Sequence, residues 1–209
     1  MILSLIILYT LSLIWLATTE RYRTAAVIMS LQGWILMGIA LLRLHSLNWG
    51  EMLFVVAETL VFKAIIVPAI LFSVIRRTKV NRIQSSGSSQ VHTLLLSLAA
   101  LIASASLTYY VADHAVNVIF LAVALYALLS GLILIVLRSR IFPHLVGFLV
   151  IENGVFLFSM AIGVEMPHLI NIAIMLDILI SILLLGLFTR KIDEQIHSDD
   201  TNLLTHVKD

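Results

Sequence analysis

Seven long apolar stretches, separated by short polar segments, run along the chain. They fall near residues 1–18, 24–42, 50–75, 93–111, 116–137, 141–162 and 167–189. Because a hydrocarbon core about 30 Å thick needs roughly 20 apolar residues in a helix, each stretch is long enough to cross a membrane. The pattern predicts an all-α integral membrane protein with about seven transmembrane helices.

The composition agrees with this class. Of the 209 residues, 61% are hydrophobic and 12% are charged, against roughly 45–50% apolar and 25% charged residues in soluble domains. The net charge of +1 gives no basic field that would attract nucleic acid. The chain has no cysteine, which excludes disulfides, thiolate nucleophiles and Cys-bound iron–sulfur clusters, so redox chemistry would belong to partners.

The Lys and Arg residues outside the apolar stretches lie in alternate connections. The connections that follow the first, third, fifth and seventh stretches contain all but one of these basic residues. They are Arg21, Arg23, Arg76, Arg77, Lys79, Arg82, Arg138, Arg140, Arg190, Lys191 and Lys208. Only Arg43 falls on the other side. The positive-inside rule then predicts an N-terminus outside and a C-terminus in the cytoplasm, which requires an odd number of spans. The first stretch lacks a basic segment before it, so we expect a span rather than a cleaved signal peptide.

Four segments follow from this pattern. We expect a three-helix N-terminal membrane half at 1–75 and a four-helix membrane half at 93–191. The linker between them, 76–92, contains a Ser-rich run and is predicted to be cytoplasmic.

The tail at 192–209 is predicted to be cytoplasmic as well. It begins acidic and then includes Asn202, Leu203 and Leu204. A disordered tail is one interpretation. The other is that these residues dock on a soluble partner, since a wholly solvated tail has no need of leucines.

Ionisable residues inside the apolar stretches are the candidate functional residues, because a charge at the bilayer centre costs about 2.5–3.5 kcal/mol on insertion scales. Four qualify: Glu58, Lys63, Glu152 and Asp177. Glu152 and Asp177 each lie about 10 residues from the turn that joins the last two stretches, hence roughly 15 Å deep. Two carboxylates in an apolar medium resist being ionised together, so the pair suits a proton relay. The alternative is that they hold two helices together by hydrogen bonds, the role we also expect for Asn153 and Asn171.

Glu58 and Lys63 are five residues apart, or about 140° around a helix, which is poor geometry for an ion pair within one helix. Lys63 is therefore expected to contact a carboxylate from another span. Pro68 lacks the donor for the carbonyl of Ala64 and predicts a kink, which would make the segment a switching point. A static pair between Lys63 and an acid is the alternative, and it would freeze a relay rather than serve it.

His144 lies two turns before Glu152 and about 80° away, so it could feed protons toward that acid. The simpler interpretation is a side chain facing the headgroups. The histidines of the outer connections have no ligand spacing, and no metal site is predicted.

Several segments resemble hydrogenase-4 component E: GFLVIENGVFLFSMAIG (147–163), NIAIMLDILISILLLGLFTRKID (171–193), FKAIIVPAIL (62–71) and the tail around Asn202. More distantly, residues 116–191 resemble the K subunit of bacterial complex I and the C subunit of Mrp-type multisubunit cation/proton antiporters. In the K subunit a Glu in each of the last two spans serves the proton axis, which carries over to Glu152 and Asp177. Two positions depart from that pattern, because the second acid is Asp and the Asn usual four residues after the first Glu is Phe156.

The resemblance implies a membrane-arm subunit without its own catalytic centre, in the bacterial cytoplasmic membrane. Its partners would be antiporter-like proton-pumping subunits, a complex I-like membrane anchor subunit and a peripheral hydrogenase module holding the [NiFe] centre and iron–sulfur clusters. The alternatives are a subunit of a related complex I-like or antiporter-type assembly without hydrogenase activity, and a purely structural assembly subunit. A stand-alone transporter is expected to show broken helices in matching positions, whereas Pro68 alone interrupts a span centre. A retinal protein needs a Lys in the last span, where this chain has Asp177.

Overall fold

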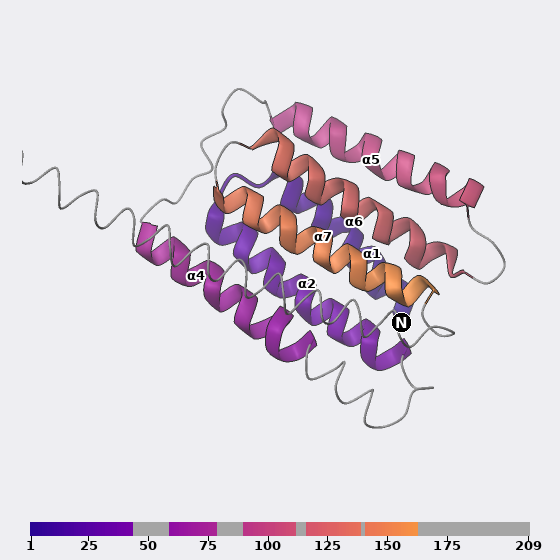
Figure 1. Ribbon diagram of the computed structural model, residues 1–209, viewed down its shortest axis with the longest axis horizontal. Helices are drawn as coiled ribbons and strands as arrows, with labels where there is room; N and C mark the ends of the chain where they lie inside the picture. Colours follow the sequence, from indigo (N-terminus) through magenta and orange to yellow (C-terminus); the bar gives the residue numbers. More distant parts are fainter. Residues whose placement is uncertain (44–58, 79–89, 112–115, 139–140, 163–209) are drawn as a thin grey trace, which may run out of the picture. The chain divides into compact units, whose positions relative to one another are not determined.

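Helices form nearly all of the chain that the computed structural model describes, which is residues 1–43, 59–78, 90–111, 116–138 and 141–162. In order these are α1 (Ile2–Thr18), α2 (Tyr22–Arg43), η2 (Thr59–Ile66), α4 (Val67–Thr78), α5 (Gln90–Val111), α6 (Val118–Leu137) and α7 (Ile141–Ile162), shown in Figure 1. These ranges contain no strand, and all of them belong to one unit, Met1–Ile174. The all-α prediction is confirmed for this part of the chain.

Four of the described helices are long and apolar enough to cross a membrane: Tyr22–Arg43, Val91–Val111, Val118–Leu137 and Phe142–Ile162. Each matches one predicted stretch, with ends that differ by a few residues. α1 is apolar but shorter, at 17 residues. These helices indicate a multi-pass membrane protein; the seventh predicted stretch and the tail lie outside the described residues.

Helices extend a few residues into both ends of the predicted linker 76–92. α4 continues to Thr78 and α5 begins at Gln90. The helices of the two predicted halves also pack on one another, because α1 contacts α5 and α6 while α2 contacts α7. The described parts of both halves therefore form a single packing unit.

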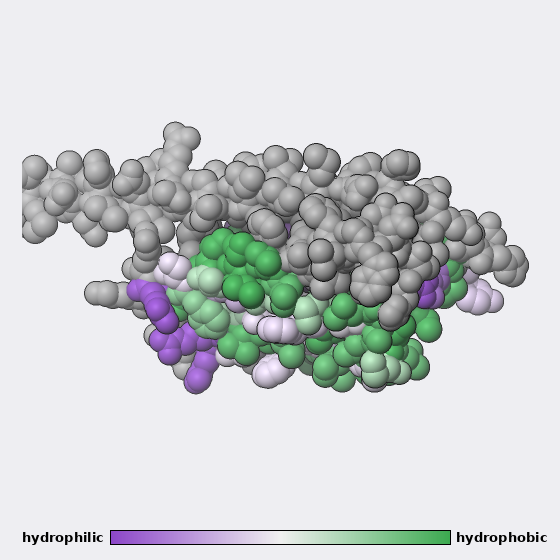
Figure 2. Space-filling view, turned by 90° about the horizontal axis from the view of Figure 1, so that it is seen from below, coloured by the Kyte–Doolittle hydropathy of each residue, from purple (hydrophilic) through white to green (hydrophobic). Residues whose placement is uncertain are grey.

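The exposed surface of the helices is largely hydrophobic. On α1 the exposed side chains include Leu3, Ile7, Leu11 and Trp15, although the buried side of the same helix is apolar too. Figure 2 shows hydrophobic side chains covering much of the described surface of one face, with hydrophilic ones gathered toward its ends. A helix that is apolar all round is expected where lipid replaces water as the solvent.

Glycines allow α6 and α7 to pack closely. A Cβ on Gly131 would lie 2.6 Å from the carbonyl oxygen of Gly147, and one on Gly147 would lie 2.8 Å from the carbonyl oxygen of Gly131. Small residues that let two backbones approach are typical of helix contacts in membranes. The start of α6 is also fixed to the end of α7, because the Asn117 backbone N–H donates to the carbonyl of Ala161 at 3.0 Å. α7 is thus held along its length against α6.

Candidate functional site: a buried polar network between four helices

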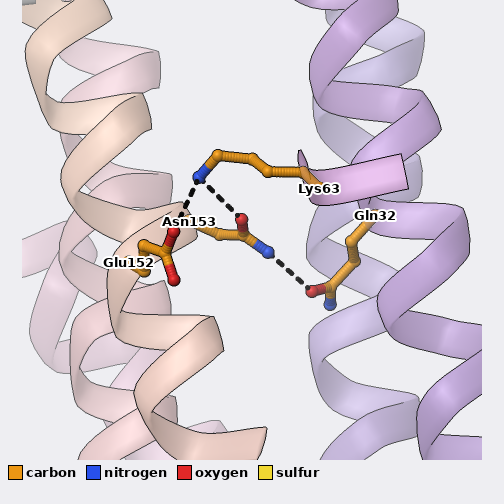
Figure 3. Close-up of polar contacts among 4 residues, drawn as sticks. All are labelled: Gln32, Lys63, Glu152 and Asn153. Atoms are coloured by element: carbon orange, nitrogen blue, oxygen red, sulfur yellow. Dashed lines mark hydrogen bonds and ion pairs between the residues drawn. The ribbon is translucent and has the colours of Figure 1, made fainter. Parts of the chain in front are cut away.

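Lys63 and Glu152 lie close together in the interior of the unit. The distance between Lys63 Nζ and Glu152 Oε1 is 3.9 Å, and both side chains are 4% exposed. Figure 3 shows the Lys63 side chain reaching from η2 toward α7, which carries Glu152. The expected contact between Lys63 and a carboxylate of another span is therefore present, and Glu152 supplies such a carboxylate.

The same ammonium group begins a chain of hydrogen bonds that leads away from Glu152. Lys63 Nζ donates to Asn153 Oδ1 at 3.2 Å, and Asn153 Nδ2 donates to Gln32 Oε1 on α2 at 3.4 Å (Figure 3). Gln32 Nε2 then donates to Ser12 Oγ on α1 at 3.0 Å, and the Ser12 hydroxyl donates to the Tyr9 carbonyl at 2.6 Å. We call these residues, Ser12, Gln32, Lys63, Glu152 and Asn153, the polar network.

The spacing on α7 explains why its polar residues share one side. At about 100° per residue, Asn153 lies about 100° and Phe156 about 40° from Glu152, so the three occupy a single arc. Gly147 and Gly154 fall on the opposite arc and face α6, where a Cβ on Gly154 would lie 3.1 Å from the Ala124 carbonyl oxygen. α7 therefore has one face for close packing and another for polar contacts.

Lys63 lies in a π-helix, η2, which gives way to α-helix at Val67. Pro68 has no N–H for the Ala64 carbonyl that an α-helix would place four residues earlier, and a π-helix moves the donor one residue further along. The π-helix that contains Lys63 therefore ends beside Pro68, and the predicted kink stays a prediction. Such segments are rare and occur frequently at functional sites.

Gly33 brings α2 against the backbone of η2. A Cβ at this position would lie 2.6 Å from the Lys63 carbonyl oxygen and 2.9 Å from Ala64 Cα. Only glycine permits this approach, and its neighbour Gln32 thereby reaches Asn153. The position of Lys63 in the network depends on a residue that carries no side chain.

Phe156 contributes an aromatic face to the same site. Lys63 Nζ lies 5.0 Å from the centre of the Phe156 ring, within the range of a cation–π contact. Phe156 therefore places an aromatic ring beside the buried Lys63 side chain.

The structure locates only part of the predicted site. Lys63 and Glu152 are brought together, whereas Glu58, Asp177 and the tail residues Asn202, Leu203 and Leu204 lie outside the described residues. His144 is half-buried, and its Nε2 donates to the Ile135 carbonyl at 2.9 Å. This bond satisfies a carbonyl in the last turn of α6, which has no donor within the helix. The hydrogen bond that the structure shows for His144 thus caps α6, and its place on the proton path stays a prediction.

Gln32 and Ser12 were not among the predicted site residues. Gln32 is fully buried, and its position in the middle of a 22-residue apolar helix was the available signal. Gln32 carries no charge, so the cost of burying ionisable residues did not single it out. Asn153 was expected to form interhelical hydrogen bonds, and its bonds to Lys63 and Gln32 confirm this.

The polar network offers one carboxylate, one amine and three neutral hydrogen-bonding side chains. In the described ranges no three His, Cys, Asp or Glu residues gather in a way that could hold a metal ion. The arrangement can bind, position and exchange a proton between groups shielded from water. Comparison of the chain with protein families, curated proteins and solved structures found no match.

Proposed function

We propose that this chain is a membrane-arm subunit of a membrane-bound [NiFe] hydrogenase of the hydrogenase-4 type, and that Lys63 and Glu152 lie on its proton path. The observation that carries the proposal is the Lys63–Glu152 pair, which is 4% exposed among helices that are apolar on their outer faces. Buried ionisable residues are rare in membrane spans and mark proton and ion pathways. The network joins this pair to α1 and α2, so a change in its charge reaches several helices.

The chemistry of the proposed step is electrostatic. Two unit charges about 4 Å apart interact by roughly 4 kcal/mol at an effective dielectric constant of about 20. A proton that binds Glu152 removes this attraction and changes the free energy of the Lys63 ammonium by a similar amount. Titration of Glu152 is thereby coupled to the position of the Lys63 side chain on another helix. A proton path that is driven by a distant reaction requires such a coupling.

The remaining parts of the proposal rest on the sequence. Asp177 would be the second acid of the path, in the seventh of seven spans, with the N-terminus outside and the C-terminus in the cytoplasm. The redox reaction would take place on partner subunits that hold the [NiFe] centre and iron–sulfur clusters. Antiporter-like subunits and a membrane anchor would flank this chain in the bacterial cytoplasmic membrane, and Asn202, Leu203 and Leu204 would dock on a soluble partner.

A purely structural role is the second candidate, and a specific observation favours it. The polar network holds α1, α2, η2 and α7 together, and such bonds stabilise helix assemblies without moving protons. A static buried ion pair would act in the same way. Under this alternative the ionisable character of Glu152 is dispensable as long as its hydrogen bonding is retained.

The test is proton uptake into inverted vesicles that hold the intact complex. Glu152→Gln and Asp177→Asn keep size and hydrogen bonding but remove titration, so assembly should persist while uptake per redox turnover falls to background. Ser97→Ala is the matched control. Ser97 is buried, and its hydroxyl lies 2.7 Å from the Tyr126 hydroxyl, which is not a member of the polar network. Wild-type uptake in the doubly neutral variant would assign the acids a structural role.

The proposed topology has its own test. The chain has no cysteine, so a single cysteine at position 88 can be labelled without a background. Protection of Ser88→Cys from an impermeant reagent added outside intact cells is expected. Labelling from outside would overturn the orientation.

A further inference from the structure

The Lys63 ammonium has contacts that do not depend on the charge of Glu152. Its Nζ is 3.2 Å from Asn153 Oδ1 and 3.9 Å from Glu152 Oε1, so the neutral amide is the nearer of the two. The Phe156 ring lies 5.0 Å from the same nitrogen. An amide oxygen and an aromatic face attract a cation whether or not the carboxylate carries a proton.

The ammonium also fixes the direction of the whole hydrogen-bond chain. A charged Lys only donates, so Asn153 must present its oxygen to Lys63 and its Nδ2 to Gln32. Gln32 must then turn Oε1 toward Asn153 and Nε2 toward Ser12, as the structure shows. The Ser12 hydroxyl completes the chain by donating to the Tyr9 carbonyl.

This direction has an electrostatic consequence. Both amides point their oxygen ends, the negative ends of their dipoles, along the chain toward Lys63. Aligned hydrogen bonds polarise one another in an apolar interior, which strengthens the acceptor at the head of the chain. Asn153 backed by Gln32 is therefore a better acceptor for a cation than an isolated amide.

We infer that Asn153, backed by Gln32 and Ser12, is a positioning residue that keeps the Lys63 ammonium charged and in place while Glu152 is neutral. The inference rests on the proposed function, in which Glu152 gains and loses a proton. The hydrogen bond from Lys63 to Asn153 persists whether or not Glu152 carries a proton, and a buried cation depends strongly on such contacts. With the amide chain in place, Glu152 can change its charge while Lys63 stays where it is.

The test measures the charge of Lys63 directly at neutral pH. The full chain is labelled with ¹⁵N at the lysine Nζ atoms and reconstituted in lipid vesicles, where nitrogen NMR distinguishes ammonium from amine. The sequence has four lysines, and the Lys63 signal is the one that Lys63→Met removes. Glu152→Gln serves as the permanently neutral form of the acid.

Glu152→Gln alone should keep the wild-type ammonium signal of Lys63. Adding Asn153→Leu, which matches the size of Asn without its oxygen, should reduce that signal several-fold, and adding Gln32→Leu should reduce it less. Adding Asn153→Gln retains an amide acceptor and should restore it. Gln32→Leu also keeps the inference testable if Asn153→Leu fails to fold.

Loss of the ammonium signal in Glu152→Gln alone would overturn the inference, because Glu152 would then be what holds the charge. An unchanged signal after both Asn153→Leu and Gln32→Leu would overturn it as well. Neither result depends on proton uptake. Failure of the proposed function would appear separately, as wild-type uptake in vesicles bearing Glu152→Gln and Asp177→Asn.

Discussion

Two sets of buried polar side chains are present, and they are built differently. The set on α5 consists of hydroxyl residues, Thr93, Ser97, Ser104 and Thr108, all at most 1% exposed. Its bonds are short-range, from Ser97 to Tyr126 on the neighbouring α6 and from Ser104 to the Leu101 carbonyl of its own helix. The polar network, in contrast, contains charges and joins four helices. The two sets therefore share burial but differ in charge and in the number of helices that they join, and the proposed function rests on that difference.

The largest loss of stability is expected when one charge of the buried Lys63–Glu152 pair is removed. Lys63→Met leaves Glu152 without the ammonium, and deleting one partner of a buried pair typically costs about 3–5 kcal/mol. Lys63→Met combined with Glu152→Gln should recover much of that loss, since no uncompensated charge remains. Unfolding of the purified chain in denaturant would measure both. A cost for Lys63→Met as small as that of Ser97→Ala would contradict the distinction between the two sets.

Gly33→Ala should have the next largest effect, because the added methyl meets the backbone at Lys63 rather than a flexible side chain. Overpacking of this kind costs about 1–3 kcal/mol, and it should also move Lys63 away from Asn153. Gly38→Ala on the same helix is the matched control, since its Cβ would lie 3.4 Å from a Leu5 methyl. The unfolding midpoint is expected to drop for Gly33→Ala alone, and equal midpoints would refute the close approach.

His144→Leu tests the comparison at a polar residue that lies outside the polar network. It removes the bond to the Ile135 carbonyl, which predicts a loss of about 1 kcal/mol in the free energy of unfolding. Proton uptake per redox turnover should stay at the wild-type level if His144 only caps α6. His92→Leu, at an exposed position on α5, is the control. A fall in uptake for His144→Leu but not for His92→Leu would support the predicted place of His144 on the proton path.

Ser97→Ala should have the smallest effect. Side-chain hydrogen bonds in membrane proteins average about 0.6 kcal/mol in double-mutant cycles, and Ser97 makes one such bond to Tyr126. The cycle Ser97→Ala with Tyr126→Phe should give a coupling of that order, with proton uptake unchanged. If uptake falls, hydroxyls on α5 belong to the path, and the contrast between the two sets fails.

The sequence predicted the described helices and the contact of Lys63 with an acid, because both follow from the cost of leaving polar groups in lipid. It did not reveal which acid, since several lay at compatible depths. The close approach of Gly33 to the backbone of Lys63 and Ala64 is a property of two helices rather than of one, so a reading of single segments did not predict it. Gln32 was missed for a related reason, because an uncharged residue becomes important only when its partner from α7 is known.

The separation of the network residues along the chain has a consequence for folding. Asn153 is 90 residues from Lys63 and 121 from Gln32, whereas α6 and α7 are consecutive helices. Contacts between distant segments close large loops and form late, so the α6–α7 hairpin should assemble before the network does.

Lys63 and Glu152 must then enter the bilayer before they meet, each at about 2.5–3.5 kcal/mol. The apolar residues that flank Glu152 offset that cost, since α7 is long and apolar enough to cross a membrane. The newly inserted chain would thus expose these two charged side chains to lipid until α1, α2 and η2 dock.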